Sequence, residues 1–204
     1  YEMGTAIFGT PYYLTKDERN TLYKAKFPNN PALEVQRDIF IFQSFIGCRI
    51  GDLMKMTKTN IINGAIEYIP RKTKEGRPVT VRVPLSPTAK EILDKYPDVP
   101  DDKLLPFISE QKYNKAIKKM IQLAGIDRIV TTINTITREE EKHPIWEVAS
   151  SHMARRNLIG NLYREVQDPN LIAKISGHTE NSKAFNRYRD IDEEMAKEVI
   201  LKLE

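Results

Sequence analysis

The sequence predicts a mainly α-helical domain with a small antiparallel β-hairpin, an α+β fold. Apolar residues recur at helical spacing over most of the chain, whereas residues 61–85 alternate as strands do, with a weaker strand pattern at 129–146. Capping residues, prolines and glycines stand where helices would begin and end. A chain of 204 residues can bury a substantial core without disulfides or metal ions, so we expect one domain over residues 1–204.

The first part of the chain predicts three helices. A capping box between Thr15 and Glu18 predicts a helix from there to about residue 27. Residues 33–46 are apolar on most sides, as expected for a central element of the core, and Gly47 can end this second helix. A third, short helix is expected at residues 49–53.

The hairpin is expected between residues 61 and 85. Isoleucines and Tyr68 precede its turn, Gly76 lies within the turn, and valines alternate after it. The turn is rich in cations, which gives the hairpin a charged tip. These cations are Arg71, Lys72, Lys74 and Arg77.

The second half of the chain predicts further helices. Ser151 is expected to be the N-cap of a strong helix. Residues 129–146 favour two short strands around a turn at 138–142. The expected helices cover residues 86–96, 109–125, 151–166 and 170–177, with a tail helix at 191–204.

Composition and charge give a weak indication of function. With 32 basic and 28 acidic residues, the net charge of +4 is a modest excess that alone does not identify a nucleic-acid-binding protein. The single cysteine, Cys48, cannot form an internal disulfide; it is expected to be a small buried side chain in a reducing, cytoplasmic setting. No apolar run approaches the ~20 residues of a membrane span. Because the sequence begins at Tyr1, we expect a fragment of a longer protein.

Two of the three histidines lie in settings that suggest chemistry. His152 and Arg155 are three positions apart on a predicted helix and therefore share a face. His178 follows Gly177, where the backbone can turn sharply, and Tyr188 follows further along the chain. Each feature alone also has an ordinary structural explanation: a surface pair, a turn or a packed tyrosine.

The order of these residues, together with two earlier ones, is more specific. The six positions are Arg49, Lys72, His152, Arg155, His178 and Tyr188. Their types and spacing resemble the tyrosine recombinases of the phage integrase family, and the resemblance covers nearly the whole chain. The Arg37-Asp38 pair before the first arginine resembles integrases of Bacteroides-type mobile elements. The resemblance implies the catalytic domain fold of that family, with the preceding DNA-binding domains absent.

The resemblance implies a DNA-cleaving site built from all six residues. Arg49 and Arg155 would hold the scissile phosphate, because a planar guanidinium can form paired hydrogen bonds to two phosphate oxygens. Tyr188 would attack to form a 3′-phosphotyrosine, with His152 as its base and His178 helping to hold the phosphate. Lys72 would protonate the leaving 5′-oxygen. No cofactor or metal ion is expected, because side chains meet the charge of the phosphate.

Two departures from the family pattern affect the site. The stretch after Lys72 is longer than in many members, which leaves Lys74 as a rival general acid. The interval from His178 to Tyr188 is one residue longer than the commonest spacing, which predicts a slightly extended loop. Asp52 is expected either to orient the first arginine or the local backbone, or to act at a helix N-terminus.

The resemblance also implies partners and a biological activity. The expected partner is double-stranded DNA, bound by a homo-tetramer of a protein that is a monomer alone. The tail helix at 191–204 would dock on a neighbouring protomer. The expected activity is site-specific recombination for the integration, excision or inversion of DNA.

Other functions remain as alternatives. A type IB topoisomerase would use nearly the same residues but rejoin the same strand, and it would relax supercoiled DNA without a specific site. A catalytically inactive DNA-binding module could keep the fold, although all six positions hold the required residue types. A metal-dependent nuclease would need clustered carboxylates, and none accompanies His152 or His178.

Overall fold

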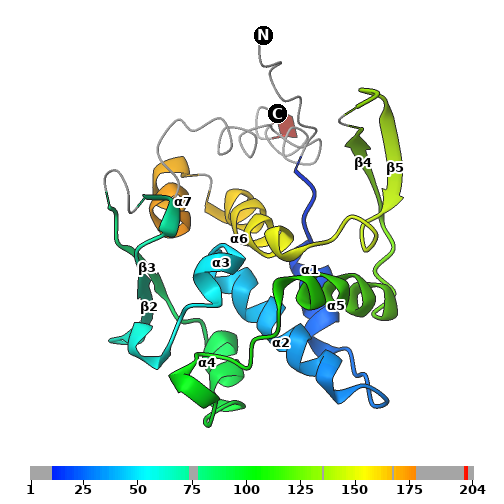
Figure 1. Cartoon of the computed structure of the whole chain (residues 1–204). Coiled ribbons are helices and arrows are strands. Elements are labelled where there is room, and N and C mark those ends of the chain that lie inside the picture. The colour runs from blue at the N-terminus through cyan, green and yellow to red at the C-terminus, as the bar shows by residue number, and fades with distance from the viewer. Residues whose placement is uncertain (1–10, 74–77, 135, 167, 178–199, 202–204) are drawn as a thin grey trace.

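The protein is a helical body with a small sheet on either side, as the computed structural model shows (Figure 1). The structure describes residues 11–73, 78–134, 136–166, 168–177 and 200–201. The predicted fold class, mainly helical with small antiparallel sheets, is confirmed. None of the helices in these ranges is long and apolar enough to cross a membrane.

The described elements follow one another as helices interrupted by the two sheets. The helices are α1 (Lys16–Lys24), α2 (Pro31–Ile46), α3 (Ile50–Leu53), α4 (Pro87–Asp94), α5 (Glu110–Leu123), α6 (Ser151–Val166) and α7 (Pro169–Ser176). The strands are β1 (Ile61–Ile62), β2 (Ala65–Tyr68), β3 (Val81–Pro84), β4 (Ile129–Ile133) and β5 (Glu140–Pro144). Three 3₁₀ turns complete the order: η1 (Lys58–Asn60), η2 (Arg71–Thr73) and η3 (Pro100–Asp102).

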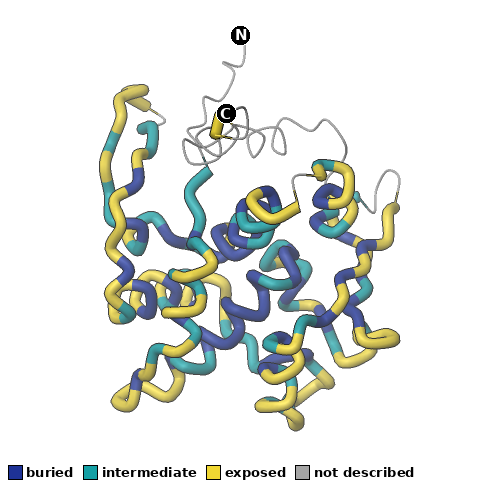
Figure 2. Tube along the Cα trace, turned by 180° about the vertical axis from the view of Figure 1, so that it is seen from behind, coloured by how far each residue is buried: buried dark blue, intermediate teal, exposed yellow. Residues whose placement is uncertain are grey.

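Helix α2 forms the centre of the core. Phe40, Phe42 and Ile46 are fully buried, and α1, α4, α5 and α6 all pack against this helix. The Asn30 side chain caps its first turn, and Gly47 ends it with a φ of +70°, as the sequence predicts. Figure 2 shows the buried residues gathered in the middle of the body, with exposed residues on its outer helices and sheets.

The first sheet differs from the single hairpin that the sequence predicts. Asn63 and Gly64 have positive φ angles of 48° and 72°, so the chain turns tightly between β1 and β2. Two-residue turns of this kind match the twist of paired strands. The sheet therefore has three strands in the order β1-β2-β3, and η2, which carries Lys72, lies in the connection from β2 to β3.

Other boundaries are confirmed or shifted by a few residues. The Thr15 amide donates to the Glu18 carboxylate at 2.9 Å, and the Glu18 amide donates to the Thr15 hydroxyl at 3.2 Å, so the capping box is confirmed. Helix α1 ends at Lys24, earlier than the expected residue 27. Residues 140–144 pair as β5, which places the turn before it rather than at 138–142.

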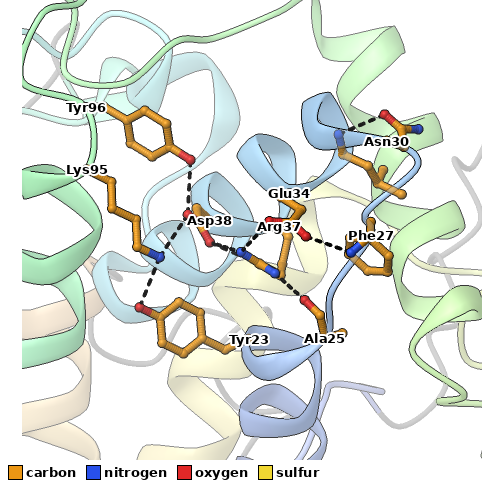
Figure 3. Close-up of polar contacts among 10 residues, drawn as sticks. Tyr23, Ala25, Phe27, Asn30, Glu34, Arg37, Asp38, Lys95 and Tyr96 are labelled. Atoms are coloured by element: carbon orange, nitrogen blue, oxygen red, sulfur yellow. Dashed lines mark hydrogen bonds and ion pairs between the residues drawn. The ribbon is translucent and has the colours of Figure 1, made fainter.

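A buried ionic network joins α2 to the ends of α1 and α4 (Figure 3). The Asp38 carboxylate accepts hydrogen bonds from Arg37 Nε at 3.1 Å, Lys95 Nζ at 3.1 Å and the Tyr96 hydroxyl at 3.0 Å. Arg37 also donates to the carbonyl oxygen of Ala25, which follows α1. Arg37 and Asp38 are only 3% and 2% exposed. The Arg37-Asp38 pair, itself shielded from solvent, thus holds three helices together.

We predict that Asp38→Asn lowers the free energy of unfolding by about 3 kcal/mol, because the buried Arg37 charge is then left with only the more distant Glu34 carboxylate, at 4.0 Å. Urea denaturation followed by circular dichroism measures the effect. Glu67→Gln is the control, since it breaks the more exposed pair of Glu67 and Arg82 and is expected to cost at most about 1 kcal/mol. Equal losses in the two variants would contradict a stabilising role for the network.

Candidate active site

Two of the predicted site residues, Arg49 and Arg155, meet at the turn between α2 and α3. Arg49 is the N-cap residue of α3 and is half-buried. Arg155 comes from the middle of α6, is 2% exposed, and donates from Nη1 to the Gly47 carbonyl at 2.7 Å. Residues far apart in the sequence are therefore brought to one turn.

Gly47 allows this meeting because α2 and α6 approach each other closely there. A Cβ on Gly47 would lie 2.3 Å from Leu158 Cδ2 of α6, and its φ of +70° is one that other residues rarely adopt. Only glycine lets the chain turn at this point while α6 packs against it. The carbonyl that anchors Arg155 belongs to this same residue.

A layer of buried polar side chains braces the turn, and the sequence analysis did not single it out. Gln43 donates from Nε2 to the Cys48 carbonyl at 3.0 Å and accepts a hydrogen bond from the Tyr113 hydroxyl at 3.0 Å. Ser44 accepts from Asn157 of α6 at 3.0 Å. The available signal was the presence of Gln43 and Ser44 in the apolar second half of α2, because buried polar groups need partners.

Cys48 is the small buried residue that the sequence predicts. Its side chain is fully buried, and burial raises the pKa of its thiol to about 12. The thiol therefore stays protonated near neutral pH. Since the thiolate is the nucleophilic form, Cys48 is inert despite its place beside Arg49.

His152 lies in the first turn of α6 and is exposed, whereas Arg155 on the next turn is buried. The expectation that Ser151 caps this helix is wrong: Ser151 is already helical, and its amide donates to the side-chain oxygen of Asn114 in α5 at 2.7 Å. A neighbouring helix thus supplies the acceptor for an amide that has no partner within α6 itself. The contact fixes the start of α6, and with it His152, relative to α5.

Lys72 lies in η2 beside a hollow of about 480 Å³. The Asp52 carboxylate accepts a hydrogen bond from the Arg71 backbone amide at 2.9 Å, which ties α3 to the start of η2. Asp52 therefore holds local backbone, one of the roles that the sequence left open. The hollow is lined by Arg49, Ile50, Gly51, Asp52, Arg71 and Lys72.

Gly177 brings the end of α7 next to η2. Its φ is +65°, and a Cβ there would lie 2.7 Å from Val81 Cγ2 and 3.5 Å from Pro70 Cγ. Pro70 immediately precedes η2, so the chain leaves α7 beside the turn that carries Lys72.

Several predicted residues fall outside the described ranges. Of the expected tail helix, only Ile200 and Leu201 are described, and both are exposed. Tyr163, the other tyrosine late in the chain, is 8% exposed and packs in the core beside α7. The predicted site residues outside the described ranges are Lys74, His178 and Tyr188.

The third histidine, His143, lies in β5 and is partly buried. Its ring nitrogens lie 3.3 and 3.4 Å from carboxylate oxygens of Glu141 and Glu147. It contacts neither arginine of the site. We therefore assign it no part in the chemistry.

Solved structures share this fold. XerH site-specific recombinase in a post-cleavage complex with a palindromic difH substrate has a TM-score of 0.65 and 16% identity, over 94% of this chain and 53% of that one. A lambda integrase tetramer bound to a Holliday junction has a TM-score of 0.63 and 18% identity, over 87% of this chain and 48% of that one. The lambda integrase catalytic core has a TM-score of 0.57 and 18% identity, over 85% of this chain and 95% of that one.

The fold is thus that of a recombinase catalytic core, and the chain spans only about half the length of XerH and of the tetrameric lambda integrase. Residues 12–195 match the model of the phage integrase family. The chain belongs to this family. No curated protein matches the sequence.

We predict that Gly177→Ala destabilises the domain more than Gly64→Ala. Both glycines have positive φ, which costs a non-glycine residue roughly 1–2 kcal/mol. A Cβ at Gly64 meets open space, whereas one at Gly177 meets Val81, so we expect a further loss of about 1 kcal/mol or more for Gly177→Ala. Denaturant unfolding measures both; equal losses would mean that α7 does not pack on β3 as described.

Proposed function

We propose that this chain is the catalytic domain of a tyrosine site-specific recombinase that cuts and rejoins double-stranded DNA through a covalent 3′-phosphotyrosine. The observation that carries the proposal is that Arg49 and Lys72 line one hollow in a chain of the phage integrase family, while Arg155 is anchored two residues before Arg49 at the Gly47 carbonyl. Cations from two separate elements line this hollow, as the binding of a phosphodiester requires.

Arg155 and Arg49 would bind the non-bridging oxygens of the scissile phosphate. Attack on phosphorus builds negative charge on these oxygens, and donors already in place stabilise that charge without reorganising. The Gly47 carbonyl accepts from one nitrogen of Arg155, which fixes the position of the guanidinium beside Arg49. The hydrogen-bonded turn between α2 and α3 would thus hold both arginines in position before DNA binds.

In the proposed reaction the Tyr188 oxygen attacks phosphorus, forming a phosphotyrosine bond as the bond to the 5′-oxygen breaks. His152 would accept the tyrosine proton, and its exposed place at the start of α6 suits contact with bound DNA. Lys72 would give a proton to the leaving 5′-oxygen, and His178 would help to hold the phosphate. The 5′-hydroxyl of a partner strand then attacks the phosphotyrosine and releases Tyr188.

We propose further that the active assembly is a homo-tetramer on DNA, formed from monomers in the cytoplasm, with the tail at 191–204 docked on the neighbouring protomer. The lambda integrase tetramer on a Holliday junction, whose fold this chain shares, supports the proposal. The Arg37-Asp38 pair supports the more specific assignment to integrases of Bacteroides-type mobile elements. Integration, excision or inversion of DNA would be the outcome.

A type IB topoisomerase would use the same chemistry on one duplex. The proposed recombinase requires two duplexes and exchanges strands between them. Site-independent relaxation of supercoiled plasmid, without recombinant products, would favour the topoisomerase.

We predict that Tyr188→Phe abolishes the covalent DNA complex while folding and duplex binding persist, because only the attacking hydroxyl is lost. The assay uses the full-length protein with end-labelled, nicked duplexes from the ends of its genomic element, and peptide mapping of the trapped adduct. Tyr163→Phe is the matched control and should retain the complex, since Tyr163 lies in the core. An adduct on any residue other than Tyr188 would refute the mechanism.

We predict that Lys72→Ala slows cleavage by about 10²–10⁴-fold, the usual contribution of a general acid. A substrate with a 5′-bridging phosphorothiolate needs no proton on its leaving group, so it should restore the rate of Lys72→Ala. Lys74→Ala should cleave the ordinary substrate at a near-normal rate. If this substrate restored cleavage by Lys74→Ala and not by Lys72→Ala, the general acid would be Lys74.

A further inference from the structure

A second, smaller hollow adjoins the candidate active site. It has a volume of about 180 Å³ and shares two wall residues, Asp52 and Arg71, with the larger hollow lined by Arg49 and Lys72. A water molecule occupies ~30 Å³ of the liquid, so this space is sufficient for a small polar group and several waters. The proposed function assigns it no role.

The smaller hollow is positively charged. Lys55 and Arg71 line it, both are exposed, and neither side chain has a hydrogen bond or ion pair within the described parts of the chain. The one carboxylate in the wall, Asp52, already accepts the hydrogen bond from the Arg71 amide. Two unpaired cations beside one occupied carboxylate favour the binding of an anion.

The remaining polar groups of the wall add no negative charge. Burial raises the pKa of Tyr68, so its phenol stays neutral and can donate a hydrogen bond. Asn60 braces the wall instead of facing a ligand: its side chain donates to the Glu67 carbonyl at 2.8 Å and accepts from the Thr57 amide at 2.9 Å. Apart from Asp52, the wall beside the two cations therefore carries no negative charge.

We propose that Lys55 and Arg71 form a second phosphate subsite, which binds the DNA phosphate next to the scissile one on the same strand. Successive phosphates of a strand are spaced regularly, about 3.4 Å apart along the helix axis. A strand whose scissile phosphate occupies the larger hollow must continue past its wall, and Arg71 stands on that wall between the two hollows. The inference rests on the proposed function, because it takes the larger hollow as the cleavage site.

The second subsite has a consequence for the reaction. A phosphate held at one point can rotate about that point, whereas a strand held at two successive phosphates keeps a defined direction across the site. Attack requires the attacking and leaving oxygens to lie in line through phosphorus. Lys55 would thus be a positioning residue, acting on the cleaved strand without touching the reacting atoms.

The first test measures the salt dependence of binding to a fluorescent 20-base-pair duplex by anisotropy, in the full-length protein. Each phosphate that a cation neutralises contributes about 0.9 to the slope of log affinity against log salt. Lys55→Met should therefore lower the slope by about 0.9, so that the variant loses roughly three-fold less affinity than the wild type between about 50 and 200 mM salt. Lys90→Met, on α4, is the control and should leave the slope unchanged.

The second test uses the duplex that forms the covalent complex, with a neutral methylphosphonate at either phosphate beside the scissile one. At one of these positions the modification should slow wild-type cleavage and have no further effect in Lys55→Met. An unchanged salt slope, or additive effects at both positions, would overturn the subsite. Absence of any covalent complex with the wild type would instead overturn the proposed function, and the salt slope would still decide whether Lys55 binds a phosphate.

Discussion

The geometry of the site depends on the close contact between α2 and α6 at Gly47. The end of α2 must turn with positive φ where the side chain of Leu158 leaves no room for a Cβ, so a single residue type satisfies both conditions. The carbonyl of that residue then receives Arg155, and Arg49 follows two positions later. The glycine that lets α2 and α6 pack together thus also anchors the arginine that we propose binds the phosphate.

Buried polar contacts, more than apolar packing, give this arrangement a single geometry. Gln43, which accepts a hydrogen bond from Tyr113, donates to the Cys48 carbonyl, and Asn157 of α6 donates to Ser44. Apolar side chains can often repack at small cost, but a buried donor without its acceptor costs about 1–3 kcal/mol. The active-site loops are therefore fixed by hydrogen bonds whose loss the fold cannot easily absorb.

Local signals predicted most of the fold, while contacts between distant residues had to come from the structure. The capping box at Thr15 and the glycine that ends α2 at position 47 could be predicted because each acts within a single helix turn. The sequence predicts a single strand across Asn63, where the structure has two, because both sides of that turn are rich in isoleucine. The prediction that Ser151 is an N-cap was wrong because the Ser151 amide instead donates to Asn114, a residue of another helix.

For the site, the sequence supplied the residue types and their order, and the structure shows that two of them meet at Gly47. The contact between Arg155 and Gly47 could not be predicted from residue types, because its acceptor is a main-chain oxygen. An acceptor on the main chain is present whatever side chain its residue carries, so, as long as Gly47 keeps the turn, neighbouring side chains can change without removing the oxygen that anchors the guanidinium.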